Sequence, residues 1–110
     1  MKYEIYQLNT ELENGVEMLY MGYDWNTSHG HEITIDKYLK VYEGEIDEIS
    51  PKLTSPVVFA AERLYDMFNL NHPADFKGRS MSVSDVVVLD GKAYYCDKIG
   101  FMDLLDFFNK

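Results

Sequence analysis

Two stretches rich in strand-forming residues stand on either side of an Asp-Gly pair, and this pattern constrains the fold most. Residues 82–89 contain four valines, and residues 92–97 contain Tyr94 and Tyr95. Between the two stretches lie Asp90 and Gly91. A two-residue hairpin turn needs positive φ at both central positions, which Asp and Gly tolerate well. The sequence therefore predicts a β-hairpin over residues 82–97, and with it an antiparallel sheet.

Two further segments have the composition of strands. Residues 3–8 alternate apolar and polar side chains, and residues 38–42 are rich in strand formers. Residues 43–45, around Gly44, suit a bulge or turn that closes the second segment. Residues 16–25 are apolar and aromatic without a clean period, so both a strand and a short helix stay open there, and residues 26–30 suit a polar loop.

Two helices are expected. The first begins at Ser55 and Pro56, because serine caps free backbone N–H groups and proline suits the first helical position. It ends at residues 71–73, since the residue before Pro73 is pushed out of the helical region. The second helix follows Gly100. Apolar residues at helical spacing form the buried stripe of each helix: Val57, Ala61, Leu64 and Phe68 in the first, and Phe101, Leu104, Leu105 and Phe108 in the second.

These elements predict one α+β domain over residues 1–110. A mainly antiparallel sheet of about four strands would carry two or three helices packed on one face. The chain has 110 residues, a size that normally forms a single core, and it contains no internal repeat or low-complexity linker.

The charge balance favours some partners over others. Nineteen acidic residues against ten basic ones give a net charge of −9. Such a charge repels phosphate backbones and anionic lipid surfaces, so direct nucleic-acid binding is disfavoured and a protein partner with a basic face is favoured. No apolar run approaches the roughly 18–20 residues that span a bilayer, and the first residues resemble a strand rather than a signal peptide. A cytoplasmic protein with no membrane contact is expected.

Few residues suggest chemistry. His29, His31 and Glu32 are close in sequence, but a zinc site needs a further positioned ligand, so a polar loop is the preferred interpretation. Cys96 is the only cysteine, which rules out an internal disulfide. It lies in a predicted strand, where a buried, unreactive thiol is expected. We therefore predict no metal and no cofactor.

Two segments suggest a contact surface. Residues 20–25 gather Tyr, Met and Trp side chains, which are enriched at interfaces although they also fill cores. The loop over residues 72–80 carries positive charge, and loops on a rigid scaffold often bind partners. The hydroxyls and carboxylate that follow it have no Gly-x-Ser-x-Gly elbow and can instead bond locally to the backbone. The predicted partner-binding residues are Tyr23, Trp25, His72, Asp75, Phe76, Arg79, Ser80, Ser82 and Asp85.

The longest recognisable pattern covers residues 69–87 and continues through Gly91, Tyr94, Tyr95, Asp97, Gly100 and Phe101. It resembles the signature of YodL-like domains, and residues 3–8 and 38–44 are similar too, whereas residues 9–36 match poorly. The resemblance implies a component of bacterial mobile elements whose activity is not established. The positions that match the signature are His72, Pro73, Asp75, Phe76, Gly78, Ser80, Ser82, Asp85, Gly100 and Phe101.

The sequence thus predicts a non-enzymatic protein-interaction or regulatory module linked to mobile elements. One alternative is an acidic inhibitor that mimics nucleic acid and occupies a basic groove, which requires acids clustered on one face. The other is an enzyme built from His72, Asp75, Ser80, Ser82 and Asp85, which requires these groups to converge in a pocket.

Overall fold

The computed structural model describes residues 2–12, 15–45, 64–65, 67–69, 73–76 and 78–109. In chain order the elements are β1 (Lys2–Leu8), α1 (Gly15–Met18), α2 (Tyr23–Ser28), the 3-10 helix η1 (Ile35–Lys37), β2 (Tyr38–Glu45), β3 (Val86–Leu89), β4 (Lys92–Cys96) and β5 (Phe101–Leu104). Residues 64–65 and 67–69 are also helical. None of the helices in these ranges is long and apolar enough to cross a membrane.

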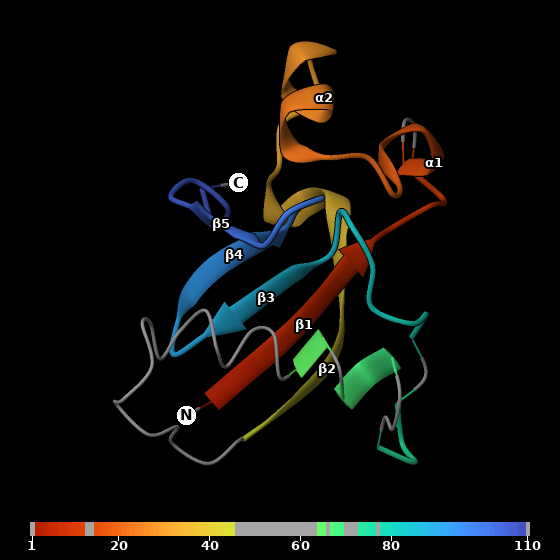
Figure 1. The fold of residues 1–110 in the computed structure, drawn as a ribbon, viewed down its shortest axis with the longest axis vertical. Coiled ribbons are helices and arrows are strands. Elements are labelled where there is room, and N and C mark those ends of the chain that lie inside the picture. The colour runs from red at the N-terminus through yellow and green to blue at the C-terminus, as the bar shows by residue number, and fades with distance from the viewer. Residues whose placement is uncertain are drawn as a thin grey trace.

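The strands form one antiparallel sheet in the order β2-β1-β3-β4-β5 (Figure 1). The predicted α+β class and antiparallel sheet are confirmed, but the sheet has five strands rather than about four. β1 and β3 are far apart in sequence and pair at the centre, whereas β2 and β5 form the two edges.

The hairpin that joins β3 to β4 has the turn that the sequence predicts. Asp90 has a φ of 48° and Gly91 a φ of 86°. The register then pairs Leu89 with Lys92 and Val86 with Tyr95. Positive φ at both turn residues matches the right-handed twist of the flanking strands, so the two strands continue directly into a paired ladder.

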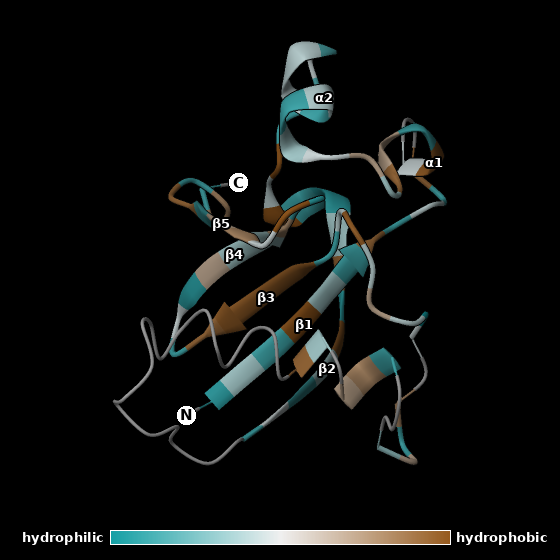
Figure 2. Cartoon of the chain, viewed as in Figure 1, coloured by the Kyte–Doolittle hydropathy of each residue, from teal (hydrophilic) through white to brown (hydrophobic). Residues whose placement is uncertain are grey.

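The sheet is buried on both faces. One face carries Ile5, Val87 and Leu89 and packs against Leu64 and Phe68, which belong to the helical residues 64–65 and 67–69. All four residues of β3 are buried, and Figure 2 shows this strand as hydrophobic along its length. A strand covered on both faces has a continuous apolar sequence instead of an alternating one, which explains the valine run.

The opposite face carries Tyr6, Val86 and Tyr95 and packs against Met18 of α1 and against Phe107. Helical segments therefore contact both faces, and the prediction that helices pack on one face only is wrong. Figure 1 shows α1 and α2 beyond the end of β1, at one end of the sheet.

The edge strand β2 contains an irregularity. Ile5 pairs with Tyr42 and Tyr6 with Lys40, so Val41 is an extra residue in β2. The predicted strand over residues 38–42 is confirmed and continues to Glu45, past the expected turn at residues 43–45.

Several predicted boundaries differ from the structure. Residues 16–25, left open between strand and helix, contribute to α1 and α2, and α2 continues into residues 26–28, predicted as loop. The strand predicted over residues 82–89 begins only at Val86, because residues 82–85 form a turn in which the Asp85 N–H donates to the Ser82 carbonyl at 3.1 Å. The first predicted helix is described only at its end, where residues 64–65 and 67–69 are helical; its start lies outside the described residues.

The predicted terminal helix is wrong. Phe101–Leu104 forms the edge strand β5, and only a turn follows at residues 105–108. β5 pairs Cys96 with Phe101 and Ala93 with Leu104. The open edge of β4 supplies hydrogen-bond partners for every second residue of this segment, and this outweighs its weak helical period.

Candidate functional site

Asp85 lies at the centre of a buried polar network beside the sheet. Its side chain has no exposed surface, and its Oδ2 accepts hydrogen bonds from the Ser82 N–H at 3.0 Å and the Gln7 side-chain amide at 3.2 Å. The Gln7 amide also holds residue 79: its Nε2 donates to the Arg79 carbonyl at 2.8 Å and its Oε1 accepts the Arg79 N–H at 2.9 Å. Gln7 thus ties the loop over residues 78–85 to the central strand β1.

Burial dominates the electrostatics of this network. Removal from water raises the pKa of Asp85 from 3.8 to about 7, although the Ser82 N–H, the Gln7 amide and the Arg79 charge each act to lower it. The Asp85 Oδ1, the Ser82 Oγ and the Arg79 Nε are buried and have no hydrogen-bond partner within the described part of the chain. The carboxyl group is therefore enclosed rather than presented to a substrate, and burial favours its protonated form at acidic pH.

Ser84 fixes the turn that precedes β3. It has a φ of 89°, which is uncommon for any residue other than glycine. Its N–H donates to the Cys96 carbonyl at 2.9 Å and its Oγ accepts the Tyr20 N–H at 3.1 Å. The Tyr38 hydroxyl donates to the Ser84 carbonyl at 2.6 Å. Partners from three distant segments hold this strained conformation, so the turn over residues 82–85 is structural.

The other predicted residues of this loop are spread out. Asp75 is exposed and accepts a hydrogen bond from the Tyr42 hydroxyl at 2.9 Å, whereas Phe76 is buried and packs edge-on against Phe68 with ring centres 4.7 Å apart. Ser80 is exposed. His72 lies outside the described residues. The structure thus brings Arg79, Ser82 and Asp85 together around Gln7, but it places Asp75 and Phe76 against β2 and the core.

The predicted contact residues of α2 have separate environments. Tyr23 packs edge-on against Tyr95 at 5.7 Å and stays partly exposed, and Trp25 stacks on His29 at 3.9 Å. His31 is buried, with its Nε2 3.5 Å from a Glu17 carboxylate oxygen. Trp25 also stacks on His31, with ring centres 6.2 Å apart, so both histidines contact this one indole. The described residues contain no group of three or more metal-ligating side chains.

Cys96 is buried in β4. Burial, with the Asp85 and Asp97 charges adding to it, raises the pKa of its thiol to about 12. The thiolate, which is the reactive form, is therefore strongly disfavoured at neutral pH.

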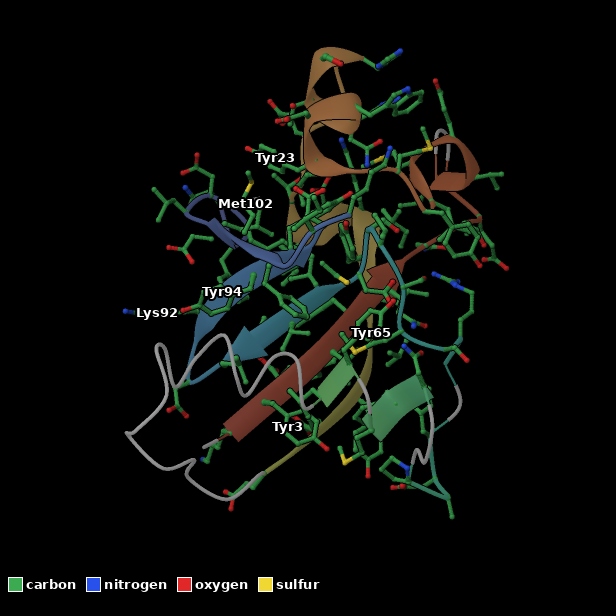
Figure 3. The ribbon with its side chains drawn as sticks, viewed as in Figure 1. Tyr3, Tyr23, Tyr65, Lys92, Tyr94 and Met102 are labelled. Carbon is green, nitrogen blue, oxygen red and sulfur yellow. The ribbon has the colours of Figure 1, made fainter. Side chains whose placement is uncertain are left out.

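A surface that the sequence did not predict surrounds β5. Within ten residues, four large apolar side chains are exposed: Ile99, Met102, Leu105 and Phe108. Ile99 is 95% exposed and Leu105 is 92% exposed. Figure 3 shows Met102 rising from β5 toward the end of the molecule where Tyr23 lies, with Lys92 projecting from the start of β4. We call these four side chains, together with the free edge of β5, the β5 surface.

An acidic hollow borders the β5 surface. Its volume is about 440 Å³, and it lies between α2, the segment after it and the C-terminal turn. Leu104, Leu105 and Ile33 supply apolar walls, while Asp103 and Asp106 supply carboxylates, together with Glu32. Tyr23 also lines this hollow and is the predicted contact residue that lies beside β5.

Sequence reasoning missed the β5 surface because it treated Leu104, Leu105 and Phe108 as the buried stripe of a helix. The signal that was available is the unusual density of apolar residues over residues 99–108. In the structure Phe107, which the predicted stripe omits, is fully buried, whereas Phe108, which the stripe includes, is exposed.

Comparison with known proteins gives one match. No curated protein and no solved structure matches the chain. The YodL-like domain family matches residues 2–107, which includes residues 9–36, the part that resembles the signature least. The matched residues include all five strands of the sheet. The chain therefore belongs to the YodL-like domain family.

Proposed function

We propose that this domain is a protein-interaction module and that the β5 surface is its contact surface. The observation that carries this proposal is the exposure of Ile99, Met102, Leu105 and Phe108 around β5, whose outer edge pairs with no strand in the described part of the chain. Several exposed apolar side chains gathered around one short strand favour an interaction site, whereas single exposed apolar residues are ordinary. Burying one such side chain fully contributes roughly 1.5–3 kcal/mol, so a partner that covers several of them gains appreciable affinity.

A regulatory role linked to bacterial mobile elements and a cytoplasmic location form part of this proposal. The family membership supports the first, since the resemblance implies such elements. The single, buried Cys96 supports the second, because a chain without disulfides suits a reducing compartment.

The arrangement of acids gives less support to a nucleic-acid mimic. Glu4, Glu43, Glu45 and Asp90 surround one hollow at the start of β1, where Lys40 lies within 3.3 Å of both Glu4 and Glu43. The acids beside β5 form a second, separate group. Among the described residues, these two groups, one of them partly neutralised by lysine, do not make the continuous charged face that a mimic needs.

The arrangement of the loop gives less support to an enzyme. Asp85 is enclosed, and its Oδ2 already accepts two hydrogen bonds. Asp75 lies against Tyr42 instead of joining Ser82 and Asp85. A nucleophile and a base within hydrogen-bond reach in an open pocket would favour catalysis, and the described residues of this segment do not form that geometry.

Affinity capture with matched variants tests the proposed function. The immobilised wild-type domain is compared with the double variant Ile99→Ser/Leu105→Ser and with the control Leu39→Ser, which removes an exposed leucine from the opposite edge strand β2. We expect a set of proteins that the wild type and the control retain equally and that the double variant loses. Equal retention by all three baits would refute the assignment of the β5 surface. Circular dichroism establishes that each bait is folded.

A further inference from the structure

Among the described strands none pairs with the outer edge of β5, and the register of the β4–β5 ladder defines which backbone groups point outward there. The Asp97 N–H donates to the Gly100 carbonyl at 3.1 Å, which closes the β4–β5 hairpin with a hydrogen-bonded pair. Hydrogen-bonded and open pairs alternate along an antiparallel ladder, so Met102 bonds to β4 next. Phe101 and Asp103 then direct their N–H and C=O groups away from β4. A strand laid against β5 would find these groups available.

The opposite edge is protected in a way that β5 is not. β2 carries the extra residue Val41, and Lys40, Glu43 and Glu45 place charges along it. Bulges and charged side chains are the usual devices that keep an edge strand from pairing with another chain. β5 pairs regularly with β4, and Asp103 is its single charged residue. Of the two edges, β5 is the one suited to accept a further strand.

The charges beside β5 indicate the chemistry of that strand. Asp103 and Asp106 line the hollow at the end of β5, next to the apolar Leu104 and Leu105. None of the ion pairs among the described residues involves either aspartate. A cationic side chain with an aliphatic stem fits this combination, because the stem covers the leucines while its charge meets the carboxylates. The net charge of −9 also attracts a basic segment from a distance.

A second copy of the domain fits this edge poorly. Pairing two β5 strands would bring two copies of Asp103 and Asp106 into one short interface between molecules that each carry a charge of −9. Like charges at such close range oppose association. The favoured occupant is therefore a different, basic chain.

We infer that the β5 surface binds an extended segment of a partner protein in which Lys or Arg alternates with apolar residues, and that this segment pairs with β5 as a further strand. The backbone of Phe101 and Asp103 gives affinity without sequence preference, and the alternating side chains give specificity. One set of side chains covers Met102, Leu105 and Phe108, and the other places its cation near Asp103 and Asp106. This inference rests on the proposed function and deepens it.

Titration with designed peptides, followed through the backbone amide signals of the ¹⁵N-labelled domain, tests the inference. The main probe is a short capped peptide of alternating lysine and valine. A second probe replaces lysine with glutamate, and a third carries N-methyl groups on the amides of one edge. We expect the lysine peptide to bind and to slow hydrogen exchange at Phe101 and Asp103. The N-methylated probe should show no measurable binding, because it cannot pair with the strand.

Two charge variants complete the test. The double variant Asp103→Asn/Asp106→Asn should weaken binding of the lysine peptide by about tenfold at low ionic strength, since surface charges contribute modestly and are screened by salt. The control Glu43→Gln/Glu45→Gln removes the same charge from the β2 edge and should leave the affinity within about twofold, because those carboxylates lie at the other edge of the sheet.

Each outcome decides between the two proposals. Equal binding of the lysine and glutamate peptides, binding of the N-methylated probe, or unchanged exchange at Phe101 and Asp103 would overturn the inference. If the peptide test failed but the Ile99→Ser/Leu105→Ser variant still lost the captured proteins, the proposed interaction module would stand and its partner would bind in another way. If the peptide test failed and the Ile99→Ser/Leu105→Ser variant also retained the same proteins as the wild type, both the inference and the proposed function would be refuted.

Discussion

Replacing Asp85 by asparagine tests the central polar network. The carboxyl group is fully buried, accepts two hydrogen bonds through one oxygen and has a pKa raised to about 7 by burial. Asparagine has nearly the same shape and retains an oxygen that can accept the bonds from Ser82 and Gln7. The substitution therefore removes the titration while keeping most of the packing.

The size and sign of the effect follow from proton linkage. Between 3.8 and about 7, the native state keeps a proton on Asp85 that the unfolded chain has released, so wild-type stability falls as the pH rises. The stability that the neutral group contributes is fully present below 3.8 and is lost as the pH rises through about 7. Each pKa unit corresponds to about 1.4 kcal/mol, so the total loss is about 4 kcal/mol. Relative to Asp85→Asn, the free energy of unfolding of the wild type should therefore fall by about 4 kcal/mol between roughly pH 4 and pH 8.

Urea unfolding of both proteins across this pH range measures the effect, with Trp25 fluorescence and circular dichroism as probes. The difference in free energy of unfolding between wild type and variant should widen steadily with pH. Asp24→Asn, which removes an exposed carboxylate from α2, serves as the control and should run parallel to the wild type. Parallel curves for the wild type and Asp85→Asn would refute the reasoning, because they would mean that Asp85 is ionised in the native state at acidic pH.

Three further predictions concern the sheet. Tyr95→Phe should lower the free energy of unfolding by roughly 1–3 kcal/mol in urea titrations, since its hydroxyl donates to the Met21 carbonyl at 2.7 Å and accepts the Asn26 side-chain N–H at 2.9 Å. Gly91→Ala should cost roughly 1–2 kcal/mol in the same assay through its φ of 86° alone, because an added Cβ would meet no atom within 4 Å; an unchanged midpoint would contradict the type of turn. Cys96 should resist alkylation in the native protein at neutral pH and react once urea unfolds the chain, so rapid labelling of the folded domain would contradict the buried, high-pKa thiol.

The parts of the fold that the sequence predicted are those governed by local chemistry. Asp90 and Gly91 specify their turn directly, and the valine run before them specifies a strand buried on both faces. Residues 3–8 were identified by their alternation, and the structure places them in β1. What the sequence could not show was the pairing of β1 with β3, which joins residues 80 to 86 positions apart.

The network around Asp85 was out of reach for the same reason. Ser82 and Asp85 are close in sequence, and their tendency to bond locally to the backbone was a stated alternative to a binding role. The Asp85 carboxyl does accept the Ser82 N–H. Gln7, however, reaches the loop from a strand 78 residues away, and nothing in its own neighbourhood marks it as the residue that holds Arg79 and Asp85.

Residues 99–108 illustrate how short apolar segments mislead. Phe101, Leu104, Leu105 and Phe108 repeat at helical spacing, but the run is too short for its period to separate a helix from a strand. In the sheet, Phe101 faces Tyr65 with ring centres 6.5 Å apart and Leu104 packs on the opposite face, as alternation along a strand requires. Leu105 comes after the last paired residue, and no layer covers it.

The same arrangement connects the acidity of the chain with the proposed contact surface. An apolar, open strand edge normally invites pairing between identical chains and, in the end, aggregation. A net charge of −9, with Asp103 on the edge itself and Asp106 beside it, opposes that pairing between copies of this domain. The same acidic charges attract a basic segment. One charge distribution therefore keeps copies of the domain apart and favours a basic partner. High salt should therefore weaken binding of the lysine peptide and, at the same concentrations, promote self-association of the free domain, which light scattering would detect.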